Sequence, residues 1–293
     1  FGGWAISGSG YGPTDNNESI KTLHAALDEG VNFIDTADSY GNGYGEELIG
    51  KILSERKDKN TIVATKFGWD FYNKNGIRSN LTPEYINFAL NNSLKRIKRD
   101  WIDIYQIHSQ NPTKIINNNV IETLEDIKQS GKIRYYGFSA NYFSDALKII
   151  KNYNIDIIQI PYNLINQSAA KEFFESIESN PVGIIGREPL ASGFLTGKYS
   201  TNSVFPKTDH RNGYSYVYIK NILDKVEQLK FLEIKGRSLT QCAINFCLQN
   251  KKIGVVIPGV KNRQQLFENL KSFEFNLTNQ QINQINTYSK NWI

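Results

Sequence analysis

Short runs of apolar, β-branched residues alternate with longer segments of helical periodicity along the whole chain. The strand candidates are residues 33–36, 61–65, 102–107, 133–138, 156–160, 182–186 and 254–257, and a first strand that ends near residues 1–4 brings the number to eight. Several of these runs are apolar on both faces, as buried parallel strands are. The pattern therefore predicts parallel strands with helices between them.

The segments between the strands carry signals of helix starts and ends. Thr14-Asp15 is expected to cap a helix that ends near Gly30, and Thr82-Pro83 opens another that runs to about Ile97. Further helices are predicted at about residues 120–129, 142–152, 168–179, 240–249 and 263–271. Repeated β-α units favour an α/β fold, a single-domain (β/α)8 TIM barrel over residues 1–293. A long loop with an extra helix (residues 196–235) and the tail after Leu277 are predicted to lie outside the repeat.

An open doubly wound sheet is the alternative architecture. Such a sheet normally carries a glycine-rich dinucleotide fingerprint directly after its first strand. Gly8-Ser9-Gly10-Tyr11-Gly12 and Gly41-Asn42-Gly43-Tyr44-Gly45 come close, but in each the third glycine arrives one residue too early. We therefore interpret both segments as loops.

Composition narrows the function classes. The 34 basic and 29 acidic residues are spread along the chain without a basic block, so a nucleic-acid partner is not expected. Apolar runs are too short to span a bilayer and no signal peptide is visible, which favours a cytoplasmic location. Cys242 and Cys247 are expected to be reduced and buried, with no Cys/His pattern for a metal. Methionine is absent, which indicates that the gene product begins before Phe1 or that methionines are missing from the sequence.

Titratable residues follow three successive predicted strands, at the rim where barrels carry their chemistry. Asp35 and Tyr40 follow the second strand, Lys66 follows the third and His108 follows the fourth. An ammonium beside a phenol lowers the pKa of the phenol, and a carboxylate holds the ammonium in place. A neutral imidazole can orient a carbonyl oxygen. Each residue alone has an ordinary structural explanation, but the set together suits reduction of a C=O group.

Longer motifs around these residues resemble the aldo-keto reductase superfamily. They are Phe33-Ile34-Asp35-Thr36-Ala37-Asp38-Ser39-Tyr40-Gly41, Ser93-Leu94-Lys95-Arg96-Ile97, Asp100-Trp101-Ile102-Asp103-Ile104-Tyr105-Gln106-Ile107-His108 and Gly131-Lys132-Ile133-Arg134. Residues 189–199 resemble the long-loop bacterial branch in particular. The resemblance covers essentially the whole chain in order, apart from the family's N-terminal hairpin. It implies a catalytic tetrad of Asp35, Tyr40, Lys66 and His108, with Tyr40 as general acid in NADPH-dependent reduction of an aldehyde or ketone.

The resemblance also implies where NADPH binds. The implied cofactor-binding residues are Gly3, Trp4, Ser139, Gln159, Arg187, Leu190, Ser192, Gly193, Leu195, Lys198, Gly259, Lys261, Gln265, Glu268 and Asn269. Ser139 and Gln159 would hold the nicotinamide carboxamide, and the segment from Leu190 to Leu195 would wrap the pyrophosphate. Lys261 and Gln265 would face the 2′-phosphate, with Glu268 and Asn269 at the adenine. A helix start with added cations near Arg263 is a ready anion site.

Two positions depart from the family pattern. Ala140 follows Ser139 where the family usually has asparagine, so one carboxamide contact depends on whether Asn141 substitutes. Arg187 stands where an aromatic ring commonly stacks on the nicotinamide. A guanidinium plane can also stack, so we weigh stacking equally against an ion pair with Glu188.

The substrate itself is not identified by the sequence. Trp4, Phe67, Trp69 and Tyr72 are candidates for an apolar substrate pocket, with packing at the barrel edge as the alternative. Residues 200–216 have the composition of a lid over the cofactor. The competing functions are a non-catalytic relative whose bound nucleotide regulates a partner, and a lyase or isomerase on the same barrel without a nicotinamide.

Overall fold

Parallel strands form the centre of the protein. The structure is a computed structural model that describes residues 1–8, 10–167, 170–178, 180 and 182–292. Seven of its strands make one parallel sheet in the order β1-β2-β5-β6-β7-β8-β9. Their bounds are Phe33–Asp35, Ile62–Phe67, Ile102–His108, Ile133–Ser139, Ile157–Pro161, Gly183–Arg187 and Val255–Ile257. Each lies within one or two residues of a run predicted from the sequence.

A single residue nearly closes this sheet into a barrel. Gly2 makes parallel bridges both to Asp35 at the end of β1 and to Gly259 after β9. The Gly2 amide donates to the Pro258 carbonyl at 2.9 Å, and the Asp35 amide donates to the Phe1 carbonyl at 2.9 Å. The eighth strand predicted near residues 1–4 is therefore only a bridge, because the chain turns at once into a 3-10 helix over Gly3–Ile6. The predicted (β/α)8 architecture is confirmed, with seven regular strands.

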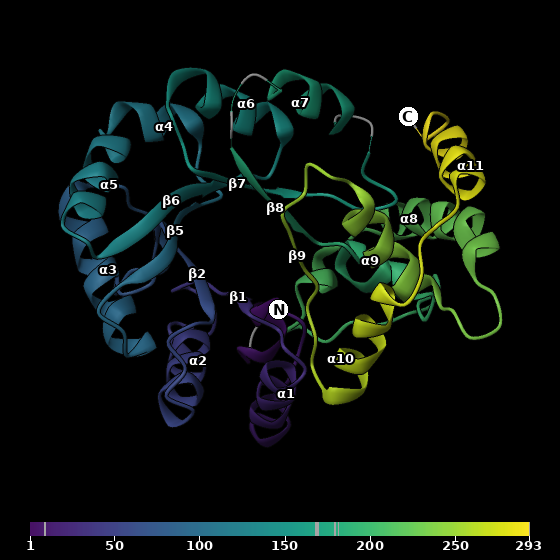
Figure 1. The fold of residues 1–293 in the computed structure, drawn as a ribbon, viewed down its shortest axis with the longest axis horizontal. Coiled ribbons are helices and arrows are strands. Elements are labelled where there is room, and N and C mark those ends of the chain that lie inside the picture. The colour runs from purple at the N-terminus through teal and green to yellow at the C-terminus, as the bar shows by residue number, and fades with distance from the viewer. Residues whose placement is uncertain (9, 168–169, 179, 181, 293) are drawn as a thin grey trace.

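Helices cover the outside of the barrel (Figure 1). They are α1 (Asn16–Asp28), α2 (Tyr44–Glu55), α3 (Pro83–Ile97), α4 (Pro112–Asn117), α5 (Val120–Gln129), α6 (Phe143–Asn152), α7 (Ala170–Ser176), α9 (Leu239–Gln249) and α10 (Arg263–Leu270). The predicted caps are present: the Asp15 side chain accepts from the Asn17 and Glu18 amides, and Thr82 accepts from the Tyr85 amide. Helix α2 was not predicted, because its N-cap Gly43 contributes no side-chain cap.

Two elements lie outside the repeat, as the sequence indicated. Helices α8 (Tyr216–Leu229) and α11 (Asn279–Ser289) lie together at one side of the barrel (Figure 1). The Trp292 indole donates to Gln228 at 3.1 Å, and the rings of Phe231 and Tyr288 lie 5.9 Å apart. These contacts hold the C-terminal segment against α8.

A small hairpin after β2 was not predicted. Its strands β3 (Trp69–Asp70) and β4 (Arg78–Ser79) pair antiparallel through Trp69 with Ser79 and Asp70 with Arg78. Two residues per strand are too few to produce a period in the sequence. The hairpin stands between β2 and α3, beside the carboxyl ends of the strands.

The apolar core is divided by the sheet into two parts. Inside the barrel, Phe33, Ala64, Ile104, Ile185 and Ile257 form a small cluster. A much larger cluster lies mainly between the strands and the helices and includes Cys242 and Cys247, which are buried and not in a disulfide. No helix of the described residues is long and apolar enough to cross a membrane.

Close packing of α2 against α3 accounts for a glycine in the middle of a helix. A Cβ added at Gly50 would lie 2.1 Å from the Arg96 carbonyl oxygen. Only a residue without a side chain permits this approach, and the approach brings the Arg96 side chain toward α2. There Arg96 forms an ion pair with the fully buried Glu46 at 2.7 Å.

Candidate active site

A buried ion pair lies at the carboxyl ends of β1 and β2. The Lys66 ammonium contacts the Asp35 carboxylate and donates to the Thr36 carbonyl at 2.8 Å. Lys66 is 1% exposed and Asp35 3%. Charges this deep in a protein require partners. The pairing of lysine and aspartate expected from the sequence is thus present.

Polar side chains from β5, β6 and β7 hold the aspartate in place across the barrel interior. The Gln159 side-chain amide donates to the second Asp35 oxygen at 2.7 Å, and the Gln106 amide donates to the same oxygen at 3.3 Å. Ser139 donates to the Gln159 side-chain oxygen at 3.2 Å. Gln106 was not predicted, although a fully buried glutamine in an apolar strand is a recognisable signal. Gln159 and Ser139 also border the cavity described below. In this structure their hydrogen bonds hold Asp35 in place.

Tyr40 lies above this pair, packed among aromatic rings. The Lys66 nitrogen lies 5.2 Å from the centre of the Tyr40 ring. The Trp4 ring stacks on Tyr40 at 5.7 Å, and the His108 ring meets it edge-on at 5.6 Å. Burial is the main cause that raises the pKa of the Tyr40 hydroxyl far above its usual range. The Asp35 carboxylate adds to this rise, and the Arg187 cation opposes it. The lowered pKa that the sequence suggested is therefore not the net result, because desolvation outweighs the Arg187 cation. The hydroxyl keeps its proton at neutral pH.

His108 completes the group as a neutral imidazole. Its Nδ1 lies 3.4 Å from the Ser39 hydroxyl. Burial, assisted by the Lys66 and Arg187 cations, holds the pKa of His108 well below its usual value. A neutral ring beside Tyr40 agrees with the state expected from the sequence.

Asp38 is a buried carboxyl that sequence reasoning did not single out. It is fully buried two residues before Tyr40, and neither side-chain oxygen has a well-formed hydrogen bond among the described residues. Its backbone amide donates to the Lys66 carbonyl at 3.1 Å. Burial, followed by the nearby Glu46 carboxylate, raises the pKa of Asp38 well above its usual value.

One large cavity of about 940 Å³ opens beside Tyr40 and His108. Most of the expected cofactor-binding residues border it: Gly3, Trp4, Ser139, Gln159, Arg187, Leu190, Ser192, Gly193, Lys198, Gly259, Lys261, Gln265, Glu268 and Asn269. Leu195 does not fit the expectation. Its side chain is buried in the core and its amide donates to the Leu190 carbonyl at 3.1 Å, so neither group is free to contact a pyrophosphate.

Arg187 forms the ion pair that the sequence left as one of two alternatives. Its guanidinium contacts the Glu188 carboxylate and donates to the Ala140 carbonyl at 3.1 Å. It also donates to the Asn141 side-chain oxygen at 3.0 Å. Asn141 also borders the cavity, where its side-chain oxygen is occupied by this bond to Arg187.

The expected substrate-pocket residues divide into two pairs. Trp4 and Trp69 border the cavity, and so does Ile77, which was not predicted. Phe67 is a correction: it is fully buried and stacks on Tyr105 at 4.5 Å. Tyr72 is another, because its hydroxyl accepts from Arg96 at 2.5 Å and its ring stacks on Phe71, away from the described lining of the cavity.

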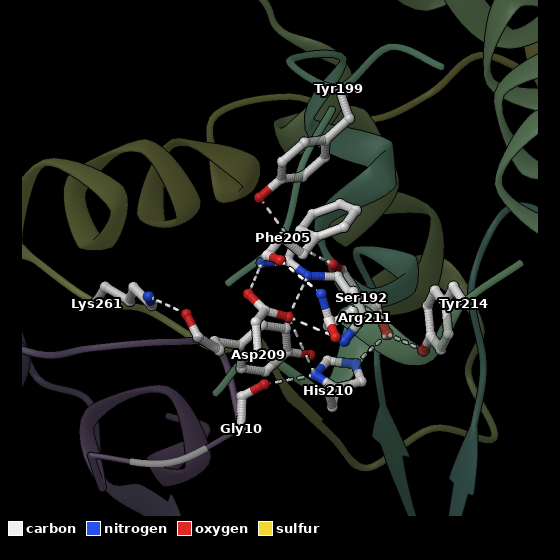
Figure 2. Close-up of polar contacts among 11 residues, drawn as sticks. Gly10, Ser192, Tyr199, Phe205, Asp209, His210, Arg211, Tyr214 and Lys261 are labelled. Atoms are coloured by element: carbon white, nitrogen blue, oxygen red, sulfur yellow. Dashed lines mark hydrogen bonds and ion pairs between the residues drawn. The ribbon is translucent and has the colours of Figure 1, made fainter. Parts of the chain in front are cut away.

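Residues 209–214, which we call the strap, tie three loops together at the cavity wall (Figure 2). The His210 Nδ1 lies 2.7 Å from the Gly10 carbonyl. Arg211 donates to the Ser192 carbonyl at 3.0 Å and to the Tyr199 hydroxyl at 2.7 Å, and Asp209 holds its guanidinium at 2.6 Å. The loop over residues 200–216, expected to act as a lid, is thus anchored at its C-terminal part. These contacts were not predicted, since loops carry no periodicity.

Cations gather at the far end of the same cavity. The Lys261 ammonium contacts the Tyr11 carbonyl, and the Lys261 amide donates to the Gln265 side-chain oxygen at 2.9 Å. Burial is the main cause that lowers the pKa of Lys261; Asp209 opposes the shift, while Arg211 and Lys198 add to it. Helix α10 begins here, and the side-chain nitrogen of Asn269 is buried without a partner among the described residues. This end of the cavity offers positive charge and an unused donor.

A nearly closed parallel barrel with a cavity at the carboxyl ends of its strands is the arrangement found in enzymes with the (β/α)8 fold. The chain belongs to the aldo-keto reductases, because the model of the Aldo/keto reductase family matches residues 1–290. It is 30% identical to the aldo-keto reductase YhdN of Bacillus subtilis, covering 100% of this chain and 90% of the relative. Several relatives of this chain have the names of oxidoreductases.

Solved structures agree in fold. The glycerol dehydrogenase AKR11B4 from Gluconobacter oxydans is 28% identical with a TM-score of 0.85, covering 100% of this chain and 91% of that one. The holo form of aldo-keto reductase AKR11C1 from Bacillus halodurans is 29% identical with a TM-score of 0.80, covering 98% and 90%. The names of two further relatives point to different roles. One is an NADH-specific methylglyoxal reductase of Escherichia coli, which is 28% identical over 95% of this chain and 90% of the relative. A rice protein, 29% identical, covering 94% and 86%, is a probable voltage-gated potassium channel subunit beta.

Proposed function

We propose that this protein is an NADPH-dependent reductase of aldehydes or ketones in which Tyr40 is the general acid. The observation that carries the proposal is the position of Tyr40. Its protonated hydroxyl borders the cavity, above the Asp35–Lys66 pair and beside a neutral His108. A carbonyl oxygen that gains negative charge requires a proton donor in such a place.

The cavity fits a nicotinamide dinucleotide. Its volume of about 940 Å³ lies at the upper end of the range of small-molecule sites. The buried donor of Asn269 is available for an adenine, and Lys198 and Lys261 supply positive charge for phosphates. A helix start adjoins these groups and favours anions further.

In the proposed mechanism, the nicotinamide supplies a hydride when it is bound. Tyr40 donates its proton to the substrate oxygen as negative charge develops there. The Lys66 cation, held by Asp35, stabilises the tyrosinate that is left behind. The Ser39 hydroxyl lies 3.4 Å from His108 Nδ1. If the hydroxyl donates to this nitrogen, the ring proton stands on Nε2, where it can orient the carbonyl oxygen.

Turnover tests this proposal directly. The protein should oxidise NADPH in the presence of a generic aldehyde such as 4-nitrobenzaldehyde, followed by loss of absorbance of the reduced nicotinamide. Binding of NADPH without turnover over a broad panel of aldehydes and ketones would favour the regulatory alternative, to which the similarity to a channel subunit points. No binding of NADPH at all would favour the lyase or isomerase alternative.

The preference for NADPH over NADH is expected to depend on Lys261. Lys261→Ala should raise the Kd for NADPH by roughly 10- to 150-fold, since a phosphate contact of a charged group contributes roughly 1.5–3 kcal/mol. The Kd for NADH, which has no 2′-phosphate, should change less than twofold. Quenching of tryptophan fluorescence measures both constants. Lys51→Ala, at an exposed lysine of α2, is the matched control. Equal weakening of the two cofactors would remove Lys261 from the phosphate site.

A further inference from the structure

One buried glutamine joins three segments behind the substrate end of the cavity. Gln110 is 4% exposed. Its side-chain nitrogen donates to the Gly68 carbonyl at 3.1 Å and to the His108 carbonyl at 3.2 Å. Its side-chain oxygen accepts from the Ser79 hydroxyl at 2.6 Å. The amide thus bridges the end of β2, the end of β5 and strand β4.

The hairpin that Gln110 holds has little support of its own. Its two strands share only two residue pairs, Trp69 with Ser79 and Asp70 with Arg78. Isolated two-stranded hairpins are marginal in water, so contacts to the barrel must fix this one. The Tyr72 hydroxyl, which accepts from Arg96 of α3 at 2.5 Å, is a second such contact. Gly68 has a φ of +121°, which other residues rarely adopt, and a Cβ there would lie 3.1 Å from the Gln110 side chain.

The same hairpin supplies one wall of the cavity. Trp69 from β3 and Ile77, the residue before β4, border the cavity together with Tyr40 and His108. Ile77 is 61% exposed, so much of its apolar surface is available to a bound molecule. The position of this apolar wall relative to His108 depends on how the hairpin is fixed to the strand that carries His108.

We propose that Gln110 is a positioning residue that fixes the hairpin to the end of β5, so that Trp69 and Ile77 contact the apolar part of a carbonyl substrate. Gln110 itself does not border the cavity among its described lining, so it acts through the hairpin. The part of the proposal that concerns substrate rests on the proposed reductase function. If the proposal holds, the preference between bulky and small carbonyl substrates depends partly on the Gln110 side chain, which lies outside the pocket.

Gln110→Met tests this inference, because methionine keeps the approximate volume and removes all three hydrogen bonds. The kcat/KM for benzaldehyde should fall about tenfold, mainly through KM, since the wall that binds the ring is no longer fixed. The kcat/KM for propanal, which is too small to need that wall, should stay within about twofold. The Kd for NADPH should be unchanged. Ser79→Ala, which removes one of the three hydrogen bonds, should act in the same direction and more weakly.

Hydrogen exchange of the amides of residues 69–80 gives a readout that does not depend on turnover. Exchange in this segment should accelerate in Gln110→Met while the helices stay protected. Equal losses for both aldehydes, or unchanged exchange in the hairpin, would overturn the positioning role. If the unaltered protein reduces no aldehyde, the proposed function fails, and the exchange experiment still decides whether Gln110 fixes the hairpin.

Discussion

Tyr40→Phe is expected to lower kcat for NADPH-dependent reduction by about 10²–10⁴-fold, the usual contribution of a positioned general acid. Phenylalanine keeps the ring that stacks on Trp4 and meets His108, so the packing of the site should persist. The Kd for NADPH should therefore remain within a few-fold. Steady-state kinetics with an aldehyde and a fluorescence titration with NADPH measure the two quantities.

Tyr216→Phe provides the control, because this tyrosine is exposed on α8, away from the residues that border the cavity. Its kcat should equal that of the unaltered protein. Loss of NADPH binding in Tyr40→Phe with little change in kcat would contradict the role of the phenol as proton donor and would make it a binding residue instead.

Lys66→Met is expected to remove activity and to destabilise the fold by about 3–5 kcal/mol, the usual effect of leaving one buried charge without its partner. Among the described residues, the hydrogen-bond donors left to the Asp35 side chain would then be the Gln159 and Gln106 amides. Urea unfolding followed by circular dichroism measures the change in the free energy of unfolding.

A second substitution separates the two effects of Lys66→Met. The double variant Asp35→Asn, Lys66→Met removes both charges and should recover much of the lost stability, since no buried charge remains uncompensated. It should not recover turnover, because the cation beneath Tyr40 is still missing. If Lys66→Met were as stable as the unaltered protein, the pair would not be the buried ion pair that the structure shows.

The strands were predictable because a strand buried on both faces must be apolar throughout. Residues 182–186 are apolar throughout, and residues 102–107 are apolar apart from Asp103 and Gln106; the structure places β8 and β5 there. Helix α2 and the β3–β4 hairpin were not predictable in the same way. The first begins after a glycine without a side-chain cap, and the second is too short for any period. The closing residue Gly2 acts through backbone hydrogen bonds, which leave no mark in the sequence.

The site was predictable where residues stand at strand ends, and less so elsewhere. Asp35, Lys66 and His108 follow from parallel strands whose carboxyl ends share one rim. Phe67 was misplaced because neighbouring side chains of a strand point to opposite faces. Lys66 points inward, so Phe67 belongs to the cluster that faces the helices. The high pKa of Tyr40 depends on the amount of water excluded around it, which spacing along a sequence does not show.

The carboxyl of Asp38 couples folding to protonation. Its pKa is about 3.8 in an unfolded chain and well above that in the folded protein, so folding in this interval takes up a proton. Linkage then requires that the contribution of Asp38 to the free energy of unfolding decrease as pH rises through the interval, by up to about 1.4 kcal/mol per pH unit. Carboxylates held by cations have the opposite dependence, and their contribution is lost on acidification. This single side chain therefore favours the native state in mild acid, and the balance between these opposed groups sets the pH at which the barrel is most stable.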